Sequence, residues 1–600
     1  GNILRHIFNH SLQKVQYSII IAQDDILKLE AVNMKIILTA IGSKYIHTAL
    51  GLRSIRAYAK AHGIETELIE DTVQTPLLAV LAEITGKEPD VVGLSVHIWN
   101  KNYVYSLIRL LRKVMPQLKI IAGGPEVSFE PERIFNERPQ IDYIVMGEGE
   151  EVFVSLINAL QQNSEPPAHV AFKKDGRTIS SGGTAVVTDL DVLEFAYPDL
   201  TDVIAGKKIV YYESTRGCPF NCSYCLSGIS RNVRKRSLDK VYADLDRMIA
   251  AGVALVKFVD RTYNLDENYY LPIMQHLADA ETDATFHFEI KADLLTENVL
   301  NFLNTVPKGR FQFEIGVQTT NAATLKAINR RDNWDKLTAN VKRLLSYGNI
   351  HLHLDLIAGL PYEGIAEFEK SFNDVYGLQP DMLQLGFLKV LPGTEMEKQR
   401  LEHELRYMDE PPYEILSTKY MPYCALRFLK ILEDVFEHTY NSGRFVYTLK
   451  YLTKAEGNAF AFYKKFALWW QKRGEYPLGH NVRGVSRLLY EFAAEYYAEK
   501  LADICELLRF DVLMFQSGWK PEFLKWHSEE LNEKSMAFWR DAERVQRYLP
   551  DYNFATWRQI QKKYAIEYFD ISPFTYEKTR NYYLFMYENG AAKTIELKDL

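Results

Sequence analysis

The sequence has little of what membrane-spanning, secreted or repetitive proteins require. No apolar run in its 600 residues approaches the roughly 20 residues of a membrane span, and no internal repeat or low-complexity tract is evident. A short apolar run, Tyr17 to Ala22, lacks the length and the small-residue cleavage site of a signal peptide. We therefore expect no membrane partner, a folded protein that begins near Met34, and an N-terminal extension over residues 1–33.

Cysteine is also scarce, with five residues of which three fall within eight positions. So few cysteines do not build a disulfide framework. The clustering of Cys218, Cys222 and Cys225 instead indicates a metal site in a reducing compartment, so we expect a cytoplasmic protein. Cys424 and Cys505 stand alone, and we expect both to be buried small hydrophobic residues.

Net charge is small for the size of the chain. A formal charge of −7 gives no global basic field that would point to nucleic acid, and we expect no nucleic-acid partner. The basic residues Arg231, Arg234, Lys235 and Arg236 leave an RNA substrate open, although such runs are usually solvated faces.

The order of buried strands and helices predicts an α/β protein. From Lys35 the strand-like segments KIILTAIG, TELIE, VVGLSVHIW, KIIAGGPE and YIVMGEG alternate with helical stretches, the first over Leu50 to His62. This pattern predicts a doubly wound, Rossmann-like parallel sheet over residues 34–161. Residues 162–205 have weak periodicity and several turn signals, and we interpret them as a linker.

Two further domains are expected. Residues 206–400 hold six strand-like segments between helices, which predicts a partial, six-stranded β/α barrel with catalytic groups at the carboxyl ends of its strands. Residues 401–600 have long helical stretches and six of the eight tryptophans, so we predict an all-helical C-terminal domain with an aromatic core.

The segment STRGCPFNCSYC places the three clustered cysteines on a loop after the first barrel strand. A structural zinc site normally has four protein ligands, and no fourth cysteine or suitably spaced histidine is near, which leaves a degenerate zinc knuckle as the weaker interpretation. Three thiolates also suit a four-iron cluster with one iron open to another ligand.

The spacing C-x3-C-x2-C, with Tyr224 before the last cysteine, resembles the motif of the radical S-adenosylmethionine (SAM) superfamily. The resemblance implies a 4Fe-4S cluster held by Cys218, Cys222 and Cys225. It implies that SAM binds the open iron and is cleaved to a 5′-deoxyadenosyl radical, which abstracts hydrogen from a substrate. It also implies a reducing partner such as flavodoxin or ferredoxin.

The same resemblance implies SAM contacts at the barrel strand ends. The usual Gly-Glu-Glu of the second strand is replaced here by Asp260-Arg261-Thr262. The residues implied to contact SAM are Tyr224, Asp260, Arg261, Thr262, Glu289, Glu314, Gln318 and Gly359.

A doubly wound domain before such a barrel resembles the cobalamin-binding domain of the cobalamin-dependent (class B) radical SAM enzymes. The resemblance rests on the segments Gly123–Glu126 and Gly147–Glu150, whose glycines let the backbone approach a ligand. The residues implied to contact cobalamin are Thr39, Ser43, Ser95, Gly123, Gly124, Glu126, Gly147, Glu148 and Gly149. The motif D-x-H-x-x-G is absent, so we expect cobalamin with its own base displaced and its lower face either open to water or covered by a residue. His47 and His97 are candidates for that residue, and the alternative is that both are loop or packing histidines.

Residues 1–217 contain no cysteine, which excludes a methylthiotransferase with a second cluster. The resemblance then favours a methyltransferase that methylates an unactivated carbon through methylcobalamin and the 5′-deoxyadenosyl radical. Two alternatives stay open: a rearrangement, ring contraction or cyclisation without methyl transfer, and a non-catalytic cobalamin or SAM sensor. The sequence leaves the substrate as an unknown small molecule or peptide.

Overall fold

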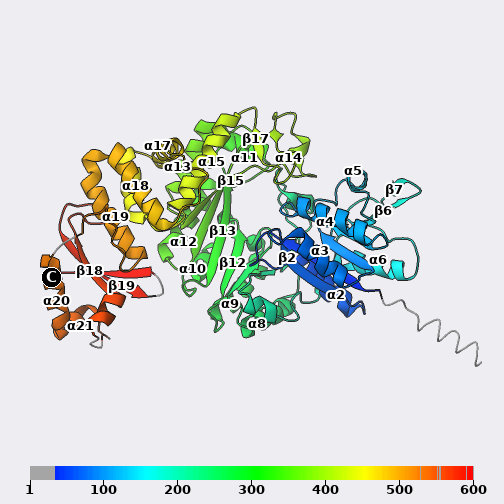
Figure 1. The fold of residues 1–600 in the computed structure, drawn as a ribbon, viewed down its shortest axis with the longest axis horizontal. Helices are drawn as coiled ribbons and strands as arrows, with labels where there is room; N and C mark the ends of the chain where they lie inside the picture. The colour runs from blue at the N-terminus through cyan, green and yellow to red at the C-terminus, as the bar shows by residue number, and fades with distance from the viewer. Residues whose placement is uncertain (1–33, 527–528, 551, 553–555, 589–590, 599) are drawn as a thin grey trace, which may run out of the picture. The chain divides into compact units, whose positions relative to one another are not determined.

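The computed structural model describes residues 34–526, 529–550, 552, 556–588, 591–598 and 600 (Figure 1). The N-terminal extension expected at residues 1–33 lies outside them. The chain divides into two units. The first runs to Gln312 and includes Lys389–Lys398 and Met408–Glu414; the second holds Phe313–Leu388, Gln399–Tyr407 and the chain from Ile415 onward. No helix in the described part of the chain has both the length and the apolar character to cross a membrane.

The N-terminal part of the first unit is the predicted doubly wound parallel sheet, with strand order β2-β1-β3-β4-β5. Its strands are β1 (Ile36–Gly42), β2 (Glu67–Thr72), β3 (Val91–Ser95), β4 (Lys119–Gly123) and β5 (Tyr143–Val145). The helices are α2 (Leu50–Ala61), α3 (Leu77–Gly86), α4 (Lys101–Val114), α5 (Pro131–Glu137) and α6 (Glu150–Gln161). Separate apolar cores lie on the two faces, one with α3, α4 and α5 and one with α2 and α6, which is why β1 and β3 are largely apolar, whereas the edge strand β2 is acidic.

The segment expected to be a linker contributes to this sheet. Strands β6 (Val170–Lys174) and β7 (Arg177–Ile179) form a hairpin, and β6 pairs antiparallel with β5. The turn signal at Asp175-Gly176 therefore marks a hairpin instead of a break between domains. The short helix α7 (Thr201–Ala205) ends the segment.

The six barrel strands predicted from the sequence are all present. In the first unit β8 (Val210–Tyr212), β11 (Leu255–Phe258) and β12 (Thr285–Ile290) are parallel neighbours, with helices α8 (Leu238–Ala250), α9 (Glu267–Asp279) and α10 (Glu297–Leu303). The second unit has β13 (Phe311–Gln318, from Phe313), β14 (His351–Ala358) and β15 (Met382–Phe387), with α11 (Ala322–Ala327), α12 (Trp334–Tyr347) and α13 (Ile365–Tyr376). Residues of β13 and β14 alternate between buried and half-buried, as expected for strands with one helix-covered face and one inner face.

A two-stranded ribbon interrupts the barrel pattern after β8. Strands β9 (Thr215–Arg216) and β10 (Arg234–Lys235) pair antiparallel and enclose residues 217–233. We call residues 217–233 the cluster loop, because they contain the three clustered cysteines. Helix α14 (Glu395–Lys398) follows the barrel strands and belongs to the first unit.

The C-terminal region is largely helical, as predicted, but not entirely so. Its helices are α15 (Tyr423–His438), α16 (Val446–Glu456), α17 (Ala459–Lys472), α18 (Val482–Tyr496), α19 (Leu501–Phe515), α20 (Glu529–Arg540), α21 (Ala542–Tyr548) and α22 (Trp557–Lys563). The short strands β16 (Arg406–Tyr407) and β17 (Ile415–Ser417) precede them.

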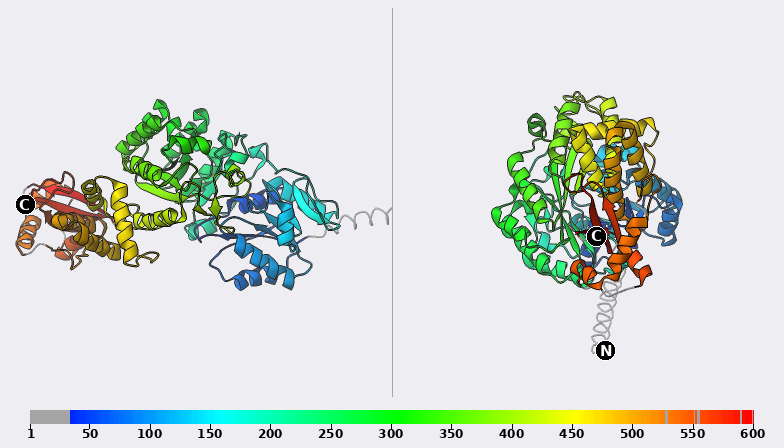
Figure 2. Two further views of the ribbon diagram at one scale, coloured as in Figure 1. Left: turned by 90° about the horizontal axis from the view of Figure 1, so that it is seen from above. Right: turned by 90° about the vertical axis from the view of Figure 1, so that its left-hand side faces the viewer.

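The expectation of an all-helical domain is wrong at the end of the chain, where three strands form an antiparallel sheet (Figure 2). They are β18 (Tyr564–Phe569), β19 (Asn581–Glu588) and β20 (Ala591–Leu597), rich in tyrosine and phenylalanine, which favour strands. One apolar core joins the sheet to α19 and another joins it to α20, α21 and α22. The predicted aromatic core is present, with Trp469, Trp470 and Trp539 buried. Cys424 is exposed, so the expectation that it is buried is wrong.

Candidate functional site

The cluster loop presents the three clustered cysteines close together in the chain and shields them unequally. Cys218 is buried, whereas Cys222 and Cys225 are half-buried. Backbone hydrogen bonds shape the loop: the N–H of Cys218 donates to the carbonyl of Ser230 at 2.9 Å, and the N–H of Cys225 to that of Cys222 at 3.1 Å. Gly217 has a φ of 97° and lies against the backbone of Asn232, so a side chain there would be strained.

The donor set fits an iron–sulfur cluster better than a mononuclear metal. Within the described residues no group of three or more His, Cys, Asp or Glu side chains is close enough to hold one metal ion. A four-iron cluster does not require that closeness, because each thiolate binds a different iron. The buried hydroxyl of Ser223, between two of the cysteines, has no hydrogen-bond partner in the described structure and is available to such a group.

Asp260 holds the start of the ribbon. Its fully buried carboxylate accepts hydrogen bonds from the backbone N–H of Ser214 at 3.1 Å and from the hydroxyls of Ser214 and Thr215 at 2.5 and 2.7 Å. Burial raises the pKa of Asp260 to about 6, although these hydrogen bonds act in the opposite direction. The resemblance implies that Asp260 contacts SAM, but in this structure its carboxylate binds Ser214 and Thr215, at the start of the ribbon that leads into the cluster loop.

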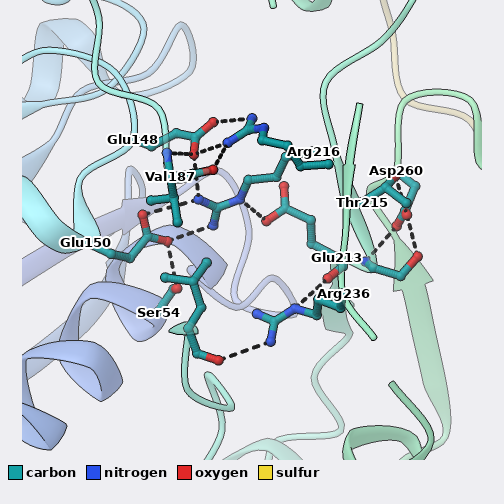
Figure 3. Close-up of polar contacts among 12 residues, drawn as sticks. Ser54, Glu148, Glu150, Val187, Glu213, Thr215, Arg216, Arg236 and Asp260 are labelled. Atoms are coloured by element: carbon teal, nitrogen blue, oxygen red, sulfur yellow. Dashed lines mark hydrogen bonds and ion pairs between the residues drawn. The ribbon is translucent and has the colours of Figure 1, made fainter. Parts of the chain in front are cut away.

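Arginines at the ribbon bind the glutamates of the segment Gly147–Glu150 (Figure 3). The Arg216 guanidinium donates to Glu150 at 2.7 Å, to Glu148 at 3.1 Å and to Glu213 at 2.7 Å. Arg234 donates to the two carboxylate oxygens of Glu148 at 2.6 and 2.8 Å. Burial would raise the pKa values of Glu148 and Glu150, but the arginines hold both below the ordinary value.

Most of the basic side chains among residues 231–236 make hydrogen bonds or ion pairs within the protein. Arg234 and Arg236 are buried, Arg236 donates to the carbonyls of Glu213 and Leu193, and Lys235 pairs with Asp266. Arg231 is exposed, and its side chain has no hydrogen bond or ion pair with the residues that the structure describes. The run is therefore not the solvated basic face that RNA binding would need.

The expected cobalamin residues lie at the carboxyl edge of the N-terminal sheet, except Thr39, which lies within β1. Ser43 follows β1, while Ser95 and Gly123 are register partners at the ends of β3 and β4. The hydroxyl of Thr39 is buried and has no partner among the described residues.

The glycines of this edge permit close backbone approach. At Gly124, where φ is 107°, an added Cβ would lie 2.6 Å from the carbonyl oxygen of Val96. At Gly147, where φ is 93°, it would lie 2.5 Å from backbone atoms of Ala185. Gly149 comes before α6, and a Cβ there would meet Ile55 at 2.8 Å. Ser43, Ser95 and the glycine-rich backbone are small polar groups of the kind that suits a large ligand at this edge, whereas Thr39 is fully buried within β1.

Glu126 has partners inside the first unit. Its carboxylate accepts a hydrogen bond from the Tyr413 hydroxyl at 2.6 Å and lies 3.4 Å from the Lys101 ammonium. Lys101 in turn donates to the Tyr413 oxygen at 2.5 Å. All three side chains are buried, so the group fixes the loop after β4 to α4 and to the segment Met408–Glu414.

The two histidines considered for the lower face of cobalamin differ in setting. Nδ1 of His47 lies 2.6 Å from the hydroxyl of Tyr211, and burial lowers its pKa. The His97 ring stacks on Trp99 with centroids 4.3 Å apart, and burial lowers its pKa to about 4. His97 is therefore neutral at physiological pH and lies two residues beyond β3, whereas His47 is held by β8.

The other residues implied to contact SAM fall in both units. In the first unit Tyr224 is half-buried, Arg261 is exposed, and Glu289 is half-buried on β12. The Thr262 hydroxyl lies 3.7 Å from the Cys218 sulfur. In the second unit Glu314 and Gln318 lie on the half-buried face of β13, and Gly359, with a φ of 87°, follows β14. Each of these residues lies on a strand or a strand-end loop.

Sequence reasoning missed Arg216, Glu150, Lys101 and Tyr413 as members of buried polar groups. Arg216 directly precedes Gly217-Cys218, and this position is the one signal that could have identified it. Tyr413 lies near the start of residues 401–600, which the sequence predicts to be a helical domain. Nothing near it in the sequence indicates its contact with Glu126.

Family models match three successive parts of the chain. The B12 binding domain matches residues 36–157, the radical SAM superfamily matches residues 212–375, and a family described as protein of unknown function (DUF4080) matches residues 401–585.

Curated relatives include methyltransferases and cyclases. An uncharacterised methyltransferase of Pyrococcus horikoshii is 22% identical over 403 residues, which cover 62% of this chain and 87% of the relative. The cobalamin-dependent radical SAM methyltransferase TokK of Streptomyces tokunonensis is 25% identical over 341 residues, 52% of this chain and 49% of TokK. An anaerobic magnesium-protoporphyrin IX monomethyl ester cyclase of Synechocystis is 25% identical over 348 residues, covering 55% of this chain and 68% of the cyclase.

Solved structures share the fold. The cobalamin-dependent radical enzyme OxsB, with aqua-cobalamin and SAM bound, matches 89% of this chain and 84% of its own with a TM-score of 0.59 at 15% identity. The methyltransferase TsrM of Kitasatospora setae, with cobalamin and a 4Fe-4S cluster bound, matches 63% of this chain and 78% of its own with a TM-score of 0.54 at 14% identity. The cobalamin and radical SAM domains in this order, on this fold, make the chain a cobalamin-dependent radical SAM enzyme, with a 4Fe-4S cluster, SAM and cobalamin as its cofactors and a DUF4080 region after the barrel.

Proposed function

We propose that this enzyme is a methyltransferase that methylates an unactivated carbon of a small-molecule or peptide substrate. The observation that carries the proposal is the match to a B12 binding domain and a radical SAM domain, together with the similarity to curated methyltransferases. The buried ion-pair network between the segment Gly147–Glu150 and the arginines of the ribbon fixes the loops for this chemistry (Figure 3). Methyl transfer between two cofactors and a substrate requires a fixed geometry, and charged hydrogen bonds away from water maintain one. The names of relatives such as TokK support the same chemistry.

When bound, cobalamin supplies the methyl group, and SAM at the cluster supplies the radical that removes a hydrogen atom from the substrate. The protein's own residues bind and orient. Cys218, Cys222 and Cys225 hold the cluster, and the ribbon fixes the loop that carries them. The resemblance implies SAM contacts for Glu289, half-buried on β12 of the first unit, and for Glu314, half-buried on β13 of the second.

Radical chemistry without net methylation is the second candidate. It is favoured by the magnesium-protoporphyrin ester cyclases, which match this chain at an identity similar to that of the methyltransferases. In that case the same loops would hold the same cofactors, and the methyl group of SAM would not be consumed.

Analysis of the products of SAM separates these functions. The full chain would be reconstituted anaerobically with iron, sulfide and cobalamin, reduced with titanium citrate, and supplied with SAM and candidate substrates. Formation of both S-adenosylhomocysteine and 5′-deoxyadenosine is expected of a methyltransferase. Formation of 5′-deoxyadenosine alone would contradict methyl transfer and favour the second candidate. Formation of neither product would favour a cobalamin or SAM sensor.

A further inference from the structure

We propose that Glu148 is a positioning residue for the cluster loop, instead of the cobalamin contact that the sequence suggests. The ribbon that closes this loop has Arg216 and Arg234 as register partners on its two strands. Directly opposed like charges destabilise an antiparallel pair unless a counter-charge is shared between them. Glu148 is that counter-charge, because Arg216 and Arg234 both donate to its carboxylate.

Four hydrogen bonds occupy most of the acceptor capacity of Glu148. Arg234 donates to both oxygens, at 2.6 and 2.8 Å, and Arg216 and the backbone N–H of Val187 donate to one of them at 3.1 and 2.8 Å. A carboxylate offers about two lone-pair directions on each oxygen, so Oε2 with three donors is fully used and Oε1 keeps one direction beside the Arg234 guanidinium. The neighbouring Glu150 differs, since it binds Arg216 and Ser54.

Arg234 depends on Glu148 most strongly, because Arg216 also pairs with Glu150 and Glu213. The side chains of Arg234 and Arg216 are only 6% and 12% exposed. A buried charge that loses its partner is far more costly than a surface charge, because water cannot replace the lost contact. Removal of the Glu148 charge is therefore expected to separate the two strands of the ribbon or to draw water between them.

The ribbon is directly connected to the cluster ligands. Arg216 is two residues before Cys218, with only Gly217 between them, and the N–H of Cys218 bonds across the loop to Ser230. A displacement of Arg216 therefore shifts the first thiolate relative to the other two. This inference rests on the cofactor assignment and does not depend on whether the methyl group is transferred.

The test compares Glu148→Gln with Glu151→Gln. Glu151 lies in the first turn of α6 and is exposed, so it is a matched control for the loss of one carboxylate. Hydrogen–deuterium exchange of the cofactor-free full chain gives a readout independent of activity. We expect faster exchange in the cluster loop of Glu148→Gln, and no change in Glu151→Gln.

The reconstituted enzyme gives a second readout. Glu148→Gln is expected to broaden the electron paramagnetic resonance signal of the reduced cluster with SAM, and to slow 5′-deoxyadenosine formation about tenfold or more, as outer residues around metal sites do. Formation of the first S-adenosylhomocysteine per enzyme, which methylates cobalamin before any radical is needed, is expected to change less than about twofold. If Glu148→Gln does not fold, Glu148→Asp keeps the charge but shortens the reach, and it should show the same changes to a smaller extent.

Two outcomes would overturn the inference. Loss of cobalamin binding with an unchanged loop and cluster signal would make Glu148 a cobalamin contact. Unchanged exchange and unchanged cluster spectra would remove any role in positioning. Failure of the wild-type enzyme to form S-adenosylhomocysteine would contradict the proposed methyl transfer alone, because the exchange and spectral effects of Glu148→Gln would still be measurable.

Discussion

The two cofactor regions of the first unit are held in different ways. The base of the cluster loop is fixed by charged side chains, namely Arg216 and Arg234 on glutamates and Asp260 on the strand before the ribbon. The carboxyl edge of the N-terminal sheet is shaped by glycines, such as Gly124 and Gly147, that let backbone segments touch. The difference indicates that changes of charge should act on the cluster chemistry, and that added side-chain volume should act on cobalamin binding.

The largest effect is expected from Cys222→Ala, which should abolish the chemistry of the cluster and leave cobalamin binding unchanged. Loss of one of three thiolates leaves the cluster without a full ligand set, so 5′-deoxyadenosine formation should fall to background. Formation of up to one S-adenosylhomocysteine per enzyme, which methylates cobalamin, should persist because the sheet edge is unchanged, whereas further formation needs the substrate radical and should stop. Product analysis by liquid chromatography measures both, with Cys424→Ala at an exposed position as the control. Loss of both products in Cys222→Ala would show that the two regions are not separable.

Gly124→Ala tests the sheet edge in the same way. The new Cβ would lie 2.6 Å from the Val96 carbonyl at a φ of 107°, so we expect a loss of unfolding free energy on the order of 3 kcal/mol or more. Cobalamin retained after gel filtration should fall as well. The control is Gly51→Ala in α2, where nothing lies within 4 Å and helix propensity predicts a gain of roughly 0.5–1 kcal/mol. Equal urea-unfolding midpoints for the two variants would contradict the role given to Gly124.

Asp260 should give the cluster-loop base a distinctive pH dependence. Its pKa is raised from 3.8 to about 6 by burial, so the folded state holds its proton more tightly than the unfolded state. Stability from this residue is then present at low pH and is lost as the pH rises from about 4 to about 6, by about 3 kcal/mol in total. Urea unfolding of the wild type and of Asp260→Asn at pH 4.5 and pH 7 checks this. The wild type should lose stability relative to the variant at pH 7, and a constant difference would refute the assignment.

The parts of the molecule predicted correctly have local signals. The three cysteines lie within one loop, and β1 and β3 are short apolar runs ended by glycine or serine, which hydrophobic periodicity detects. The β6–β7 hairpin and the final sheet were missed, although Asp175-Gly176 and the aromatic residues of β18 and β19 carried the relevant local signals. The segments around the hairpin have weak periodicity and those around the final sheet are helical, and these neighbouring patterns outweighed the local signals.

The missed parts of the site depend on distant contacts. Arg216 meets Glu148 across 68 positions of sequence, and Glu126 meets Tyr413 across 287. No periodicity links such pairs, since they arise only when the folded elements pack. The sequence around a glutamate in a glycine-rich loop does not differ between one that binds a ligand and one that binds a cationic side chain. The prediction that Glu148 and Glu126 contact cobalamin therefore rested on their residue type and loop position alone.

The smallest effect is expected from Tyr413→Phe, which sharpens the comparison because it removes a hydroxyl and no charge from the sheet edge. The Lys101 ammonium and the Glu126 carboxylate remain 3.4 Å apart and can still pair, so the loss of unfolding free energy should be only about 1–2 kcal/mol. Rates of formation of both SAM products should stay within about twofold of the wild type. Lys101→Met is the contrasting variant, because it leaves the buried Glu126 carboxylate without its cation and should cost about 3 kcal/mol or more. A Tyr413→Phe variant as unstable as Lys101→Met would mean that the hydroxyl, and not the ion pair, holds the loop after β4.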